Sequence, residues 1–162
     1  MAQLKLNEEI IGRGDLLRLS REVNALNDFF VGAKARSAAS PAELPKTSKQ
    51  LDRMATDNQC NLLDEKQRQT FSELLKSLES TAPTLHISFA TEATPRTLQP
   101  IIAWFRENIH PNILLSVGYQ PHIAAGCVLR TPNKIFDLSM GAYLEKQAPL
   151  LTKLLAGSIN GS

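Results

Sequence analysis

The chain has 162 residues, of which 43% are hydrophobic and 21% charged, as is usual for a globular protein of one domain or two small ones. Its 18 basic and 16 acidic residues are interspersed and leave a net charge of +2, which argues against the basic surface of a typical nucleic-acid-binding protein. Acids stand near the N-terminus where a secretory signal needs an apolar core, so we expect no signal peptide. The longest uncharged run, 108–129, contains Pro111, Gly118 and Pro121, and it predicts a strand–turn–strand rather than a membrane span.

Residues 1–81 predict a small N-terminal helical bundle. Apolar residues recur at spacings of three and four between Leu16 and Phe30, as on one face of an amphipathic helix, and Asp15 is placed to cap that helix. A proline-containing connector and two more helical patterns follow, the second beginning near Asp64. Because three such helices enclose only a small core, we expect this half to be the less stable one, or to rest on a partner or on the second half.

Residues 82–162 predict a small domain with the order β-α-β-β-β-α, so that the whole chain belongs to the α+β class. The period changes from helix to strand at Pro83. The expected elements are a strand at 84–89, a helix from Pro95 to Ile109, strands at 113–119, 123–130 and 135–137, and a terminal helix that starts at Ser139. Leu98, Ile101, Ile102, Phe105 and Ile109 form the expected buried stripe of the first of these helices.

The histidines and cysteines do not predict catalysis. No pair among the three histidines has the spacing of a zinc-binding helix, and His86 falls on the strand face opposite Leu85 and Ile87. Cys60 and Cys127 lie far apart in the sequence and predict two buried or half-buried free thiols. We therefore expect neither a metal nor a cofactor.

Three residues of the last hairpin have a physical interpretation. Gly126 lies inside a strand, which marks a bulge or the close approach of another backbone. Ser139 is placed to cap the terminal helix. Asp137 has two readings that the sequence leaves open: an ordinary turn residue, or an acid that holds the strand–helix junction rigid by accepting backbone amides.

With these features in view, the segment from Pro121 to Leu144 resembles the C-terminal domain of the delta subunit of F-type ATP synthase. That family has an acid–proline turn, a Gly-Gly pair, a strand ending in arginine, a turn, and Asp-Gly-Ser before a helix that contains a leucine. The matching residues here are Pro121, Gly126, Arg130, Asp137, Ser139 and Leu144. The chain departs from the pattern at Gln120, Ala125 and Leu138. The resemblance covers residues 83–156.

The resemblance implies a non-catalytic subunit of the peripheral stalk of a rotary, proton-translocating ATP synthase. Its family links the catalytic head to the membrane sector, at the cytoplasmic face of the cell membrane, and reaches the membrane only through partner subunits. The implied partners are the C-terminal helices of the b subunit and the N-termini of the alpha subunits, with no nucleic acid and no cofactor. The family has a six-helix N-terminal bundle, whereas this chain has room for three or four helices.

A partner surface is also predicted. The two helices of the second half carry more apolar residues than a four-stranded sheet easily covers, and exposed apolar and aromatic residues usually mark an interface. Trp104, Tyr143, Leu150 and Leu154 lie toward the flanks of the buried stripes, and we expect them to bind a b-subunit helix.

Two alternatives stay open at this stage. One is a small α+β module of unrelated function that binds a protein or a nucleic acid, for which a steep salt dependence on nucleic acid would speak. The other is an enzyme with an unrecognised site, which a pocket holding a strongly shifted titratable group would favour.

Overall fold

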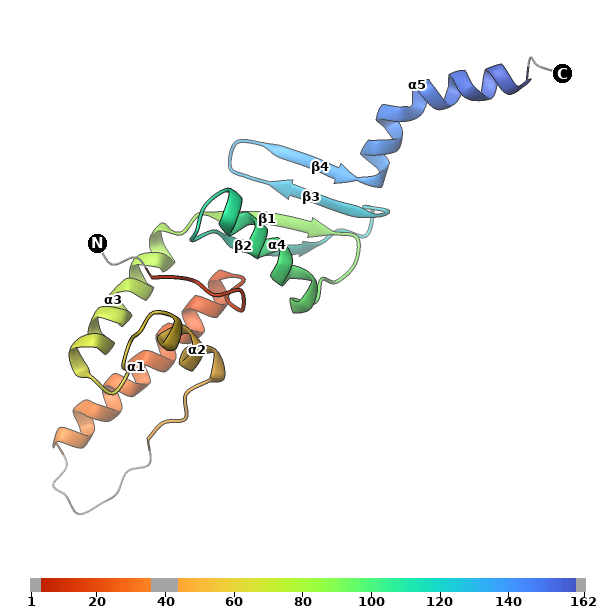
Figure 1. The fold of residues 1–162 in the computed structure, drawn as a ribbon. Coiled ribbons are helices and arrows are strands. Elements are labelled where there is room, and N and C mark those ends of the chain that lie inside the picture. The colour runs from red at the N-terminus through yellow and green to blue at the C-terminus, as the bar shows by residue number, and fades with distance from the viewer. Residues whose placement is uncertain (1–3, 36–43, 160–162) are drawn as a thin grey trace. The chain divides into compact units, whose positions relative to one another are not determined.

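The computed structural model describes residues 4–35 and 44–159, and for residues 34–35 and 151–159 it describes the backbone alone. Within that part the chain is a mixed α+β protein with five helices and one four-stranded sheet (Figure 1). The elements are α1 (Arg13–Ala35), α2 (Lys49–Asp57), α3 (Glu65–Thr81), β1 (Thr84–Phe89), α4 (Pro95–Asn108), β2 (Leu114–Tyr119), β3 (Gly126–Arg130), β4 (Ile135–Ser139) and α5 (Met140–Ile159).

The chain forms two compact units. The first comprises Met1–Thr84 and Pro95–Leu115, and the second comprises Leu85–Thr94 and Ser116–Ser162. Helix α4 thus groups with the N-terminal helices, whereas the sequence divides the chain once, between residues 81 and 82. That single division stays a prediction.

The core of the first unit is built on the helical periodicity. Helix α1 buries Leu16, Leu19, Val23 and Leu26, and only Phe30 of the expected stripe is half-buried. The facing residues come from α2, α3 and the start of β2, and they are Leu51, Met54, Phe71, Leu75, Leu78 and Leu114. The core is therefore larger than three short helices alone provide.

The N-terminal segment Leu4–Ile10 adds to this core without forming a helix. Its backbone has no regular structure, yet Leu4, Leu6 and Ile10 are buried in the same cluster. Asn58 holds it by accepting from the amide of Lys5 at 2.7 Å and donating to the Lys5 carbonyl at 3.0 Å. A helical interpretation of these first residues is wrong, because tertiary hydrogen bonds replace the local ones.

Helix starts follow ordinary capping chemistry. Ser48 caps α2 by accepting from the Leu51 amide, and Asp64 caps α3 by accepting from two amides. The expected cap of α1 is wrong by about one turn: α1 begins at Arg13, and Asp15 instead accepts from the amides of Ile11 and Gly12 at 3.0 Å. A carboxylate inside the first turn can reach back to amides that precede the helix, as in a capping box.

Helix α4 buries fewer residues than its sequence pattern suggests. Leu98, Ile102 and Phe105 are buried, whereas Ile101 is half-buried and Ile109 is 58% exposed. Ile109 lies beyond the last residue of the helix, so its side chain does not continue the helical stripe.

The sheet has the strand order β2-β1-β3-β4 and is mixed, with β3 antiparallel to both β1 and β4. Strand β3 begins at Gly126 rather than at the expected Ile123. The preceding residues form a turn that follows Pro121, which has no amide to donate to a ladder. Thr131 and Lys134 close the β3–β4 hairpin through a hydrogen bond from the Thr131 amide to the Lys134 carbonyl.

Candidate functional site

One face of the sheet is entirely apolar across three strands. The register of β1, β3 and β4 places two rows of side chains side by side, three residues in each row. We call this surface the apolar face; its residues are Ile87, Leu129 and Phe136 in one row and Phe89, Cys127 and Leu138 in the other. The opposite face is mixed, because its rows bring His86 beside Arg130 and Ser88 beside Val128 and Asp137.

Burial of the apolar face decreases from β1 to β4. Ile87 is 2% exposed, Leu129 is half-buried, and Phe136 is 48% exposed. In the second row Phe89 and Cys127 are half-buried and Leu138 is 58% exposed. The outer part of the face therefore presents large apolar side chains to solvent on an edge strand, which natural proteins usually cover or blunt.

Gly126 allows the β3–β4 hairpin to close. Its φ is +91°, a left-handed conformation that side chains rarely adopt, and a Cβ there would lie 2.4 Å from the Leu138 carbonyl oxygen. The close backbone approach expected at this position is confirmed. Leu138 stands where the resembled family has glycine, and it is the Leu138 backbone that Gly126 meets.

The junction between β4 and α5 is held by hydrogen bonds. The Ser139 amide donates to Asp137 Oδ1 at 2.9 Å, and Ser139 Oγ accepts from the Ala142 amide at 3.2 Å. The Met140 amide donates to the Ala125 carbonyl at 2.8 Å. Hydrogen bonds that Ser139 donates to the Asp137 carboxylate lower the pKa of Asp137, and the charge of Lys146 adds a smaller lowering. Of the two readings of Asp137, the structure bears out the one in which it accepts a backbone amide.

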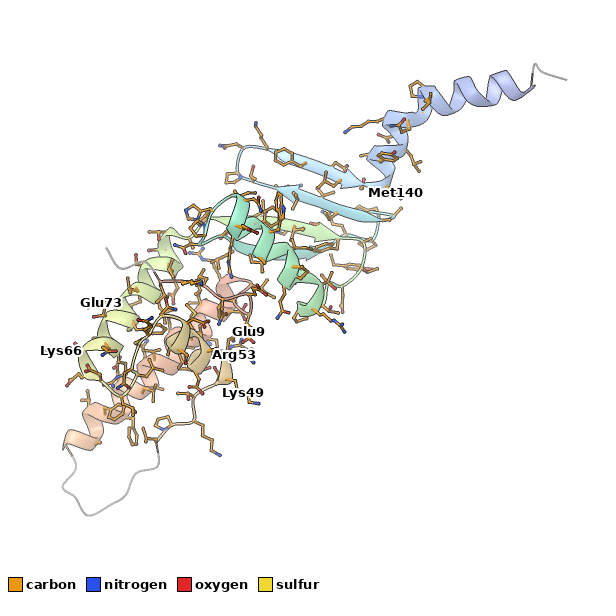
Figure 2. The ribbon with its side chains drawn as sticks, viewed as in Figure 1. Glu9, Lys49, Arg53, Lys66, Glu73 and Met140 are labelled. Carbon is orange, nitrogen blue, oxygen red and sulfur yellow. The ribbon has the colours of Figure 1, made fainter. Side chains whose placement is uncertain are left out.

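Helix α5 follows the junction with its apolar residues uncovered. Met140, Tyr143 and Leu144 are 49%, 60% and 50% exposed, and their spacing of three and four puts them on one side of the helix. Figure 1 shows α5 leaving the end of β4 instead of lying on the sheet, and Figure 2 marks Met140 at its base. The exposed side of α5 is thus a second apolar surface, and in sequence it directly follows β4 of the apolar face.

The predicted partner residues fall in both units. Trp104 lies on α4 in the first unit and is 56% exposed, while Tyr143 and Leu150 lie on α5 in the second unit and are also exposed. The side chain of Leu154 lies outside the described part of the chain. Their joint role as an interface stays a prediction.

The residues matched to the family motif all lie in the second unit. Pro121 is in the turn before β3, Gly126 and Arg130 are the two ends of β3, and Asp137 and Ser139 form the junction before α5. Leu144 lies on the exposed side of α5. The structure brings together Gly126, Leu138 and Ser139 at the end of the hairpin, since Gly126 pairs with Ser139.

The described histidine that makes most polar contacts is His86. Its Nδ1 lies 3.1 Å from Ser116 Oγ and its Nε2 lies 3.3 Å from Ser88 Oγ. A nucleophilic serine needs a base that a third group orients. Here both ring nitrogens face hydroxyls, so the cluster ties β1 to β2 and lacks the order of a catalytic triad.

Sequence reasoning missed Arg106, which anchors the N-terminal segment in the first unit. Its guanidinium donates to the Asn7 carbonyl at 2.5 Å, to the Ile10 carbonyl, and to the Ile113 carbonyl at 3.3 Å. Burial lowers the pKa of Arg106 to about 10, and the nearby Glu8 partly opposes that shift. An arginine directly after the buried Phe105 was the available signal, because a charge beside a core position usually needs a partner.

Arg106 also lines a hollow of about 1020 Å³ in the first unit. Its walls carry charges of both signs that pair locally, as between Glu9 and Arg53, which lie side by side in Figure 2. Asn7 likewise donates to Asp57 at 3.5 Å. The hollow is thus walled in part by side chains that hold the N-terminal segment in place.

Cys60 and Cys127 are free and half-buried, as expected, and burial raises the pKa of both thiols. Among the described residues no cluster of histidine, cysteine and acidic side chains is suited to a metal ion. In the same part of the chain, none of the helices combines the length and apolar character needed to span a bilayer.

No protein-family model matches this chain, and no curated protein is significantly similar to it. Its function must therefore be inferred from the residues and their geometry.

Proposed function

We propose that this chain is a divergent delta subunit of an F-type ATP synthase, a non-catalytic component of the peripheral stalk. The observation that carries the proposal is the hairpin of β3 and β4. Gly126 meets the Leu138 backbone at positive φ, and Asp137 and Ser139 form a hydrogen-bonded junction before α5. Gly126, Asp137 and Ser139 stand at positions of the family's motif, whereas Leu138 departs from it.

The proposed role is mechanical. A stalk must resist the torque that the rotor exerts on the catalytic head, and an adaptor does so through extended interfaces. The second unit offers uncovered apolar surface on β4 and α5, which suits it to receive a b-subunit helix. In this proposal residues 1–81 are a reduced counterpart of the family's helical bundle and meet the alpha-subunit N-termini, and the chain lies at the cytoplasmic face of the cell membrane.

Co-purification tests the proposal directly. The full chain, immobilised through its N-terminus, is expected to retain the C-terminal peptide of the b subunit from the same organism, with weak dependence on salt. Tyr143→Asp is expected to lower retention at least tenfold. Val31→Asp is the matched control, since Val31 is 64% exposed but lies on α1. Retention of no b-subunit peptide by the wild-type chain would overturn the proposal.

Gene neighbourhood gives an independent check. We expect the gene for this chain to lie beside genes for b, alpha and gamma subunits. Steeply salt-dependent binding to nucleic acid, with no stalk protein retained, would instead favour an unrelated binding module.

A further inference from the structure

The second unit carries two uncovered apolar surfaces that match each other in kind. One is the outer part of the apolar face, where Phe136 and Leu138 stand about 7 Å apart along β4. The other is the side of α5 that holds Met140, Tyr143 and Leu144, which spans about 6 Å along the helix. Exposure of either surface to water is unfavourable because both are apolar. The two surfaces have similar lengths, so each can cover the other.

Helix α5 does not cover the apolar face of its own chain, where Phe136 and Leu138 stay exposed. Ser139 is the last residue of β4 and Met140 the first of α5, so no residue is left for the reversal that would lay the helix back on its sheet. Connections between a strand and the helix packed on it usually have two to six residues. The hydrogen bonds of Ser139, Met140 and Ala142 fix the direction in which the helix leaves.

We propose that a second copy of this chain covers the apolar face, with α5 of each copy lying on the apolar face of the other. A connection too short to close within one chain favours exchange of the element between chains. The exchange is reciprocal, so it satisfies both surfaces in both copies and ends at a symmetric dimer.

The charges of the second unit fit this arrangement. The apolar face holds five hydrocarbon side chains and the thiol of Cys127, whose pKa is raised by burial. On α5, Glu145 and Lys146 fall on the side away from Met140, Tyr143 and Leu144. Covering one surface with the other therefore buries no charge.

The dimer is a property of the free chain and does not rest on the stalk function. A b-subunit helix would compete with the second copy for the same surface, so the two proposals are tested apart, with and without stalk peptide. An isolated chain that stays monomeric but binds the peptide would overturn the dimer and leave the proposed function standing.

The mass of the full chain in solution tests the proposal. Light scattering after size exclusion is expected to give twice 17.9 kDa at micromolar concentration and a shift toward 17.9 kDa on dilution. Leu138→Asp and Tyr143→Asp are each expected to raise the dimer dissociation constant more than tenfold. The matched control is Ile135→Asp, because Ile135 is 62% exposed on the same strand but points to the opposite sheet face. A monomeric wild-type chain, or equal loss in all three folded variants, would overturn the proposal.

Disulfide trapping tests the exchange itself, because Cys127 lies on the apolar face. In a Cys60→Ser background, Leu144→Cys is expected to give a covalent dimer on mild oxidation, well above the background from Cys127 alone. Glu145→Cys, on the other side of α5, is the control. A disulfide formed within one chain, or equal trapping from both positions, would overturn the exchange of helices.

Discussion

At the scale of single residues, Gly126 has the tightest backbone constraint among the described glycines. Its positive φ and the Leu138 carbonyl at 2.4 Å from a built Cβ leave no room for a side chain. We expect Gly126→Ala to lower the free energy of unfolding of the second unit by about 1–3 kcal/mol. Tyrosine signals report on that unit, because Tyr119 and Tyr143 both lie in it.

Gly14 provides the matched control for Gly126. A Cβ at Gly14 meets no atom within 4 Å, and the residue lies in α1. Gly14→Ala is expected to be neutral or to stabilise by about 0.5–1 kcal/mol, because alanine loses less backbone entropy in a helix. Equal unfolding midpoints for both variants would contradict the constraint at Gly126.

The junction before α5 predicts a pH dependence. Folding lowers the pKa of Asp137, chiefly through hydrogen bonds from Ser139. The ionised carboxylate therefore stabilises the folded state fully at pH values above 3.8, the ordinary pKa of the group. This stabilisation is lost as the pH falls through the lower folded-state value. We expect Ser139→Ala to raise the pKa of Asp137, measured by NMR titration of its carboxyl carbon, and to cost α5 about 1 kcal/mol. An unchanged titration in Ser139→Ala would show that the contact does not persist in solution.

At the scale of elements, the N-terminal segment Leu4–Ile10 is anchored by Arg106. We expect Arg106→Met to lower the free energy of unfolding by about 2–3 kcal/mol, because it removes the guanidinium that donates to the buried Ile10 carbonyl and leaves the Asn7 carbonyl with the Ile10 amide alone. Arg53→Met is the control and is expected to cost less than about 1 kcal/mol, since Arg53 pairs with Glu9 at the surface. Fluorescence of Trp104, in the same unit, follows the transition. A cost for Arg106→Met no larger than the control's would contradict the anchoring role.

The elements show what the sequence could predict. The apolar period located α3 and β1, because Phe71, Leu75 and Leu78 recur at helical spacing and Leu85, Ile87 and Phe89 alternate within six residues. The segment Leu4–Ile10 could not be predicted, because its order comes from donors and acceptors as distant as Arg106. The same holds for the uncovered side of α5, since periodicity marks an apolar stripe but does not say whether the fold covers it.

At the scale of the whole molecule, burial is unequal between the two units. Of the ten largest fully buried side chains, nine lie in the first unit and Ile87 alone lies in the second. The sequence left the N-terminal half either less stable or resting on a partner or on the second half, and the burial of Leu114 from β2 in the core of the first unit accords with the latter. The added burial comes from Leu4, Leu6 and Ile10 and from the residues of α4 and β2 that group with the N-terminal helices.

Hydrogen exchange of the full chain is expected to follow this inequality. At dilution, amides of α1 and α3 should exchange at least a hundredfold more slowly than those of β4 and α5, because local opening costs least where few apolar contacts must be broken. At concentrations where a second copy covers the apolar face, β4 and α5 should slow down while α1 and α3 stay unchanged. Peptide-resolved mass spectrometry measures both regimes on one sample. Faster exchange in α1 than in β4 at dilution would show that burial does not set local stability in this chain, and that the N-terminal half is the marginal one after all.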